Sequence, residues 1–212
     1  MRTQINPHFV ANSLNAIESL INLGKSKAAA KYLVHFSRLS RQIQNSSKTA
    51  TISLAQEVKT LKHFLVLEQL RFRDKLSYEI QVAPTINQNL IMVPALVLQP
   101  YVENAIWHGL KPKAAGGHIL IKVSKIGNVL SYCIEDNGIG RVKSKKIQAA
   151  SVLKDKSMGK QITKAHLKAM IRIKGTQVAI QDLVDKDGQA CGTKTTIRFP
   201  YKLKACKKQH FC

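Results

Sequence analysis

Residues 99–109 have the sequence QPYVENAIWHG, which places polar side chains inside an otherwise apolar predicted helix. Asn104 and His108 are four residues apart and share one helix face, and Glu103 lies beside that face. Taken alone, the motif is more typical of a structural role, with Asn104 capping a loop and His108 as a satisfied core histidine. The rest of the chain changes this interpretation.

A second motif, EDNGIG at residues 135–140, ends a predicted strand. The Asp136 carboxylate is followed by Gly138 and Gly140, which allow a ligand to approach the backbone closely. Alone, this string is also compatible with a hairpin turn or a fragment of a calcium loop. A third and weaker element, Gly192-Thr193, opens the last predicted strand.

These three elements, in this order, resemble the ATP-binding fold of gyrase, Hsp90 chaperones, histidine kinases and MutL, the GHKL fold. The resemblance implies that Asn104 holds the Mg ion that bridges the ATP phosphates, with His108 on the same helix face. It assigns Asp136 to the adenine amino group, Gly138 and Gly140 to the pocket wall, and Thr193 to the adenine side. An amide oxygen suits Mg, and a buried carboxylate can accept the amino hydrogen bond.

The N-terminal segment QINPHFVANSLNAI, residues 4–17, resembles the phosphoacceptor box of LytS-type sensor histidine kinases. The resemblance implies that His8 accepts the phosphoryl group, and a helix N-terminus tolerates the resulting negative charge. Residues 53–76 resemble the helix that leads into the ATP domain of the same family. Val10-Ala11 departs from the usual Leu-Phe of the box.

The phosphate lid of this family normally has two or three glycines, whereas residues 157–160 read SMGK. Gly159 and Lys160 are therefore the candidate phosphate contacts, at the start of a predicted helix over 160–174. The span 141–174 is strongly basic and without aromatic residues, which is typical of a solvated face and disfavours a nucleic-acid surface.

Hydrophobic periodicity predicts an α+β fold with two parts. Helices are expected from Pro7 to Gly24, across Tyr32–Ile43, and from Ser53, whose hydroxyl can cap Gln56, to Phe72. A period of two then predicts strands at 77–83, 118–124, 129–135, 177–184 and 193–199, with helices at 95–110 and 160–174. We expect a helical dimerisation and phosphotransfer region at 1–75, a GHKL-type sandwich at 76–201, and a disordered basic tail at 202–212.

The length of 212 residues allows one or two domains of roughly 150 residues. The net charge of +22 favours polyanionic partners, among them nucleic acid, an anionic membrane and ATP, without choosing between them. Its four cysteines are expected to be free thiols because their spacing shows no CxxC pair. No window has the roughly 18 apolar residues of a spanning helix.

The sequence therefore predicts the cytoplasmic catalytic core of a membrane-anchored sensor histidine kinase whose sensor and membrane segments lie upstream. Its expected partners are ATP, a second copy of the chain and a response-regulator receiver domain, with no direct nucleic-acid contact. A GHKL ATPase of the chaperone or mismatch-repair type and a basic nucleic-acid-binding module are the alternatives. Pro100 stands where GHKL hydrolases carry the glutamate that acts as general base. Glu103 is expected to point away from the face of Asn104, and both features favour the kinase.

Overall fold

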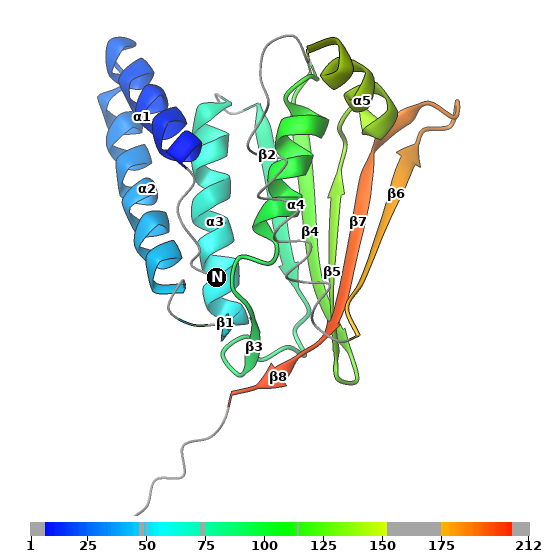
Figure 1. Ribbon diagram of the computed structural model, residues 1–212. Helices are drawn as coiled ribbons and strands as arrows, with labels where there is room; N and C mark the ends of the chain where they lie inside the picture. Colours follow the sequence, from blue (N-terminus) through cyan, green and yellow to red (C-terminus); the bar gives the residue numbers. More distant parts are fainter. Residues whose placement is uncertain are drawn as a thin grey trace, which may run out of the picture.

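The computed structural model describes residues 7–46, 49, 51–72, 75–113, 115–151 and 175–204, and the side chains of residues 7, 8, 46, 148, 150 and 151 are outside the description (Figure 1). Its helices are α1 (Pro7–Asn22), α2 (Ser26–Ser46), α3 (Leu54–Arg71), α4 (Gln99–Asn104), the π-helix η1 (Ala105–Leu110) and α5 (Gly140–Ser151). Its strands are β1 (Thr51–Ser53), β2 (Leu76–Val82), β3 (Ile91–Pro94), β4 (Gly117–Ile126), β5 (Val129–Asp136), β6 (Gln177–Val184), β7 (Ala190–Pro200) and β8 (Lys202–Leu203).

A five-stranded sheet with the order β2-β4-β5-β7-β6 forms one layer of the fold. Strands β2 and β4 are parallel, and the other neighbours are antiparallel. The register of β5 against β7 places Asp136 opposite Thr193, so two candidate site residues meet at the same edge of the sheet. The five strands predicted from the sequence all exist, and the predicted α+β class is confirmed.

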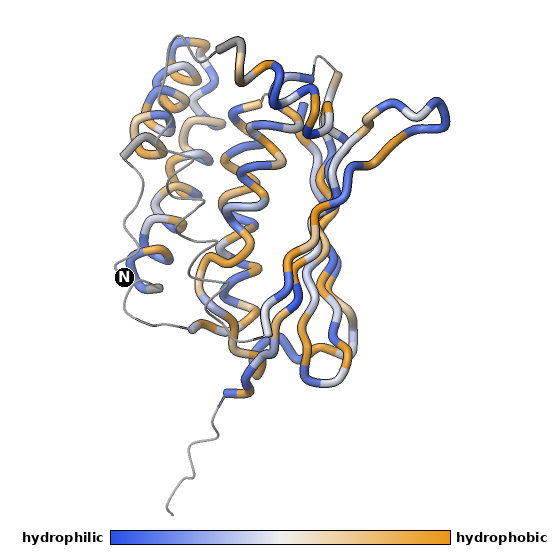
Figure 2. Tube along the Cα trace, turned by 45° about the vertical axis from the view of Figure 1, so that its right-hand side comes forward, coloured by the Kyte–Doolittle hydropathy of each residue, from blue (hydrophilic) through white to orange (hydrophobic). Residues whose placement is uncertain are grey.

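The helices lie on one side of this sheet, with α4 and η1 next to the strands and α1 and α2 farthest from them (Figure 1). Buried apolar residues of α2, α3, α4, η1 and the strands form one contiguous core. Figure 2 shows the hydrophilic turn between β6 and β7 projecting beyond this packed region. The proposed division of the chain at residue 75 remains a prediction.

Helix α3 begins where the sequence predicts, at a capping box. The Ser53 hydroxyl accepts from the Gln56 amide at 3.2 Å, and the Gln56 side chain accepts from the Ser53 amide at 3.0 Å. The helix then packs between α2 and the rest of the core, so that ten of its 18 residues are buried. This central position makes α3 the link between the first two helices and the sheet.

Helices α1 and α2 form a hairpin that turns at Gly24, whose φ is +68°. Phe9 contacts Phe36 and Phe64, with ring centroids 6.0 and 6.2 Å apart, and so attaches α1 to both other helices. Large apolar side chains nevertheless remain exposed on the hairpin: Leu14, Ile21, Leu23, Leu33 and Val34. The hairpin thus keeps an apolar face that none of the described residues covers.

The helix expected over 95–110 is wrong in its start and in its regularity. It begins only at Gln99, because Leu96 has a φ of +59° and Pro100 occupies the first turn. From Ala105 it becomes a π-helix, as shown by the bond of 2.8 Å from the Lys111 amide to the Ile106 carbonyl.

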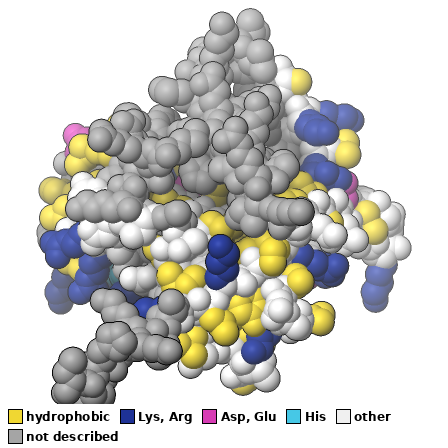
Figure 3. All heavy atoms as spheres, turned by 60° about the horizontal axis from the view of Figure 1, so that its bottom comes forward, with side chains coloured by type: hydrophobic (Ala, Val, Ile, Leu, Met, Phe, Trp, Pro, Cys, Tyr) yellow, Lys and Arg dark blue, Asp and Glu magenta, His cyan; other side chains and the backbone are white. Residues whose placement is uncertain are grey.

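The sequence also gave no indication of α5 or of the small sheet β1-β3-β8. The expected disorder of the tail is wrong for Lys202 and Leu203, because they pair with β3 and the Lys204 amide donates to the Leu90 carbonyl at 2.8 Å. This end of the molecule comes forward in Figure 3, where Lys and Arg side chains surround apolar ones. The helix predicted at 160–174 lies outside the described residues.

Candidate functional site

Asp136 is the last residue of β5 and is only 6% exposed. Its Oδ1 atom accepts a hydrogen bond of 2.9 Å from the Gly138 amide. Burial raises the pKa of this carboxyl to about 6, although hydrogen bonds from the backbone of Gly138 and Thr193 oppose the shift. Backbone donors fix the direction of this carboxylate. Because it is buried, a further hydrogen-bond donor would stabilise its ionised form.

Glycines allow the backbone segments around Asp136 to approach one another closely. A Cβ atom on Gly138 would lie 2.5 Å from the carbonyl carbon of Gly109, and one on Gly109 would lie 2.8 Å from Oδ1 of Asp136. A Cβ on Gly192 would collide with the Asp136 carbonyl oxygen. Gly140 has a φ of +74° and faces Ala190. Close packing therefore requires glycine at 109, 138 and 192 and favours it at 140. The pocket role expected for Gly138 and Gly140 remains a prediction.

The segment after Asp136 is fixed to neighbouring strands and helices by hydrogen bonds. Asn137 Oδ1 accepts from the His118 amide at 2.8 Å, and the Asn137 carbonyl accepts from Lys113 Nζ at 2.7 Å. The Ile139 amide donates to the Gly109 carbonyl at 3.0 Å. Sequence reasoning missed Lys113 and Asn137, because nothing in their local pattern indicates these distant partners.

Asn104 and His108 lie on the helical segment that ends against Asp136. Asn104 is the last residue of α4, His108 is in η1, and both are half-buried. In the i→i+5 pattern, each turn takes up more residues than in an α-helix, so residues four and five apart share a face. The π-helix also brings Gly109 against Asp136, which joins the two predicted motifs into one region.

Glu103 is engaged within its own helix. Its Oε1 atom accepts from Gln99 Nε2 at 2.8 Å, and burial raises its pKa. Proline at position 100 provides no general base. That Glu103 does not take over this role remains a prediction, and the hydrogen bond to Gln99 is compatible with it.

Glu57, which the sequence reasoning missed, anchors the segment before α4. Its carboxylate accepts from the amides of Leu96 and Leu98 at 2.9 and 3.1 Å. Burial raises the pKa of Glu57 to about 7, against the opposing effect of these bonds. A single side chain of α3 therefore holds the strained turn that aims the helix carrying Asn104.

Trp107 of η1 contacts α3 through Arg71. The guanidinium of Arg71 and the ammonium of Lys111 each lie 4.3 Å from its ring centroid. Arg71 also contacts Glu68 at 3.7 Å, and Glu68 is almost completely buried. Both ends of the Asn104-bearing helical segment are thus fastened to α3.

The structure brings Asp136, Gly138, Gly140 and Thr193 together, with Asn104 and His108 on the adjoining helical segment. His8 lies in the first turn of α1, but its side chain is outside the described residues. Gly159 and Lys160 lie outside the described residues as well.

This arrangement fits a purine nucleotide. A buried acceptor at the end of a strand, next to backbone that carries no side chains, suits the edge of a flat base. An asparagine amide on the adjacent helix suits a Mg ion held mainly by phosphates, because Mg keeps oxygen ligands from water and nucleotide. No described helix combines the length and apolar character that crossing a membrane requires.

The fold itself defines a class. Over 90% of its length, the chain superposes on 93% of the histidine kinase domain of the blue-light activated histidine kinase from Erythrobacter litoralis, with a TM-score of 0.50 and 14% identity. The fold is therefore that of a histidine kinase catalytic region, with a GHKL-type sheet and helices.

Sequence similarity defines the family. Residues 1–76 match the family model described as histidine kinase. The chain is 34% identical over 140 residues to sensor histidine kinase YpdA of Escherichia coli. The alignment covers 66% of the chain and 24% of YpdA. It is 28% identical over 213 residues to sensor protein LytS of Staphylococcus epidermidis, which covers 100% of the chain and 34% of that protein.

The chain belongs to the LytS-type sensor histidine kinases. It spans between about a quarter and a third of the length of these two relatives.

Proposed function

We propose that this chain is the catalytic core of a sensor histidine kinase that transfers the γ-phosphoryl group of ATP to His8. The observation that carries the proposal is the buried Asp136 carboxylate in a wall of glycines, joined to the helical segment of Asn104 and His108. The histidine kinase match over residues 1–76 supports His8 as the acceptor.

The residues present suggest a division of tasks. Asp136 would orient the base, Gly138, Gly140 and Gly192 let the backbone pack closely around this carboxylate, and Thr193 flanks the Asp136 position. Asn104 would hold Mg, with His108 beside it, and Gly159 and Lys160 would contact phosphate. Bound Mg supplies charge neutralisation at the transferred phosphoryl group.

The proposed step forms a bond from a ring nitrogen of His8 to the γ-phosphorus and breaks the bond from that phosphorus to the bridging oxygen, releasing ADP. A neutral imidazole is itself a nucleophile, so attack by His8 would need no activated water. With proline at position 100 and Glu103 bonded to Gln99, hydrolysis by the same site would lack a positioned base. This distinguishes the kinase from a GHKL ATPase.

Further partners follow from the family. We propose that the phosphoryl group passes to an aspartate of a response-regulator receiver domain. We also propose that the exposed apolar face of α1 and α2 pairs with a second copy of the chain. In the full-length protein, membrane segments would precede this cytoplasmic core.

The test is incubation with Mg and γ-labelled ATP. The wild-type chain should acquire an acid-labile, base-stable label with a stoichiometry of up to one per chain. His8→Gln should acquire none while binding ATP with unchanged affinity, because acceptor and pocket lie on different elements. Label retained on His8→Gln would remove His8 from the acceptor role. Sustained phosphate release at the wild-type rate by that variant would favour the ATPase instead.

A further inference from the structure

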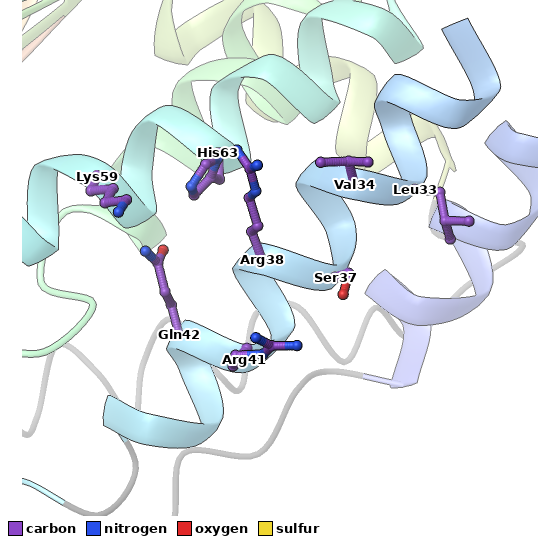
Figure 4. A pocket seen from close by; sticks show the side chains of 8 residues that line it. All are labelled: Leu33, Val34, Ser37, Arg38, Arg41, Gln42, Lys59 and His63. Carbon is purple, nitrogen blue, oxygen red and sulfur yellow. The ribbon is translucent and has the colours of Figure 1, made fainter. Parts of the chain in front are cut away.

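A pocket of about 490 Å³ lies between α2 and α3, and none of the candidate nucleotide-site residues lines it. Figure 4 shows Arg38 and Gln42 of α2 and Lys59 and His63 of α3 directed into the space between the two helices. Arg41 also lines it, and Leu33 and Val34 form its apolar end. The volume is within the usual range of small-molecule sites, roughly 300–1,000 Å³.

The charge of this pocket is one-sided. Helix α2 has no acidic residue, and none of the residues lining the pocket is acidic. Within the described part of the chain, no ion pair neutralises Arg38, Arg41 or Lys59. Three cations that line one concave surface without a counter-charge attract an anion.

A buried donor points to the same kind of ligand. His63 is 8% exposed, and its Nε2 atom has no hydrogen-bond partner among the described residues. Its other ring nitrogen, Nδ1, lies 3.0 Å from Nδ1 of His35. When the more exposed His35 donates in this bond, a neutral His63 carries its proton on Nε2. Leaving a buried donor unsatisfied is costly, so a ligand acceptor is favoured there.

The surroundings of the two histidines keep His63 neutral. Burial lowers the pKa of both rings, and Lys31, Arg38 and Lys59 add to this shift. The same positive charges oppose a divalent metal ion, although two imidazoles in contact would otherwise suit one. An anion is the ligand that satisfies both the cations and the ring N–H.

Gln42 adds a polar contact of adaptable direction. Its Oε1 atom is buried without a partner among the described residues. The amide can accept from a hydroxyl group or, turned by 180°, donate to an oxyanion.

We propose that this pocket binds a small metabolite with two or three negative groups, carboxylates or phosphates. These groups contact Arg38, Arg41 and Lys59, and one of them accepts the Nε2–H of His63. The carbon part of the ligand lies against Leu33 and Val34. Binding of an anionic metabolite would thus act on α2 and α3, the two helices that link α1, which carries His8, to the sheet.

The test uses the full chain, without ATP or Mg, titrated with citrate and separately with pyrophosphate at constant ionic strength set by chloride. The ring resonances of the histidines are followed by two-dimensional NMR. We expect saturable shifts of His35 and His63 and a ¹⁵N signature of the Nε2–H tautomer at His63. A response to one probe alone supports the proposal and identifies carboxylate or phosphate as the preferred group.

Variants with matched charge changes separate the pocket from general electrostatics. Arg38→Gln and Arg41→Gln should each weaken binding by about tenfold or more, since a charge-assisted hydrogen bond is lost. Lys62→Gln, an exposed change on α3 outside the pocket, should leave the affinity unchanged.

Three outcomes of the titrations and variant measurements would overturn the proposal. These are no saturable shift of His35 and His63, equal affinity in all variants, or shifts confined to His108 and His118, which would place the anions at the nucleotide edge. Loss of the anion-induced shifts at protein concentrations where the chain is dimeric would also overturn it, because a second copy would then cover the pocket at Leu33 and Val34.

Discussion

The sheet edge at Asp136 and the hairpin of α1 and α2 differ in how tightly they are packed. At the edge, backbone packs on backbone so closely that Gly109, Gly138 and Gly192 have no room for a Cβ atom. The hairpin instead leaves Leu14, Ile21 and Leu33 more than half exposed. Among the described residues, the first region is closely packed, whereas the second presents an apolar face to solvent.

The most damaging change to the rigid edge should be Gly192→Ala. The added Cβ would collide with the Asp136 carbonyl, so β5 and β7 must separate where Asp136 pairs with Thr193. We expect a loss of about 4 kcal/mol in the free energy of unfolding and loss of ATP binding. Denaturant titration and calorimetric ATP binding measure the two effects.

Gly188→Asn is the matched control, because Gly188 also has a positive φ of +73° but nothing within 4 Å of an added Cβ. It should cost less than about 1 kcal/mol, since asparagine tolerates the left-handed region. Equal losses from both substitutions would mean that the crowding at Gly192 has no special role.

The second prediction concerns the anchor of the Asn104 segment. Glu57→Ala leaves the buried amides of Leu96 and Leu98 without their acceptor. We expect a loss of about 3 kcal/mol in stability and weaker Mg·ATP binding, because α4 is no longer held at its start. Lys62→Ala, on the exposed face of the same helix, should leave ATP binding unchanged. Full ATP affinity in folded Glu57→Ala would refute the positioning role.

The third prediction sets function against stability at Asp136. Asp136→Asn should weaken ATP binding by about 2 kcal/mol, because a charge-assisted acceptor is replaced by a neutral amide. The same change should stabilise the unliganded chain above pH 6. The native carboxyl has a pKa of about 6 against an ordinary value of 3.8, so keeping it ionised in the fold costs free energy.

The sign of the pH effect at Asp136 can be checked directly. Below pH 3.8 the carboxyl is neutral in both the folded and unfolded states, so its burial carries no ionisation cost. As the pH rises from 3.8 to 6, the wild type loses up to about 3 kcal/mol relative to the asparagine variant, since one pKa unit corresponds to about 1.4 kcal/mol. Thermal unfolding at pH 4 and pH 8 measures the difference, and a variant that gains nothing at pH 8 would contradict a buried, strained carboxylate.

The smallest effect on the single chain should come from the hairpin face. Leu14→Ser combined with Leu33→Ser should change the stability of the monomer by less than about 0.5 kcal/mol, because both side chains are exposed. If the face pairs two copies, sedimentation should show a dimer for the wild type and a monomer for the variant. An unchanged oligomeric state would assign the face to another partner.

Much of the architecture could be predicted because its signals are local. The Ser53 and Gln56 capping box involves residues three apart, and the period of two over 177–184 describes a strand with bounds that match the structure. The motifs around Asn104 and Asp136 likewise carry their chemistry in a few consecutive residues. These features follow from the sequence alone, because short-range hydrogen bonding and side-chain alternation determine them.

The tertiary structure decided what depends on residues far apart in the chain. Glu57 and Leu98 are separated by 41 positions, yet their hydrogen bond fixes where α4 starts, which periodicity placed too early. The pairing of Leu203 with Ile91 turns a tail that was expected to be disordered into a strand. Gly192 is indispensable only because the Asp136 carbonyl lies against it. Such contacts have no local signature, since each exists only after the sheet and helices have packed together.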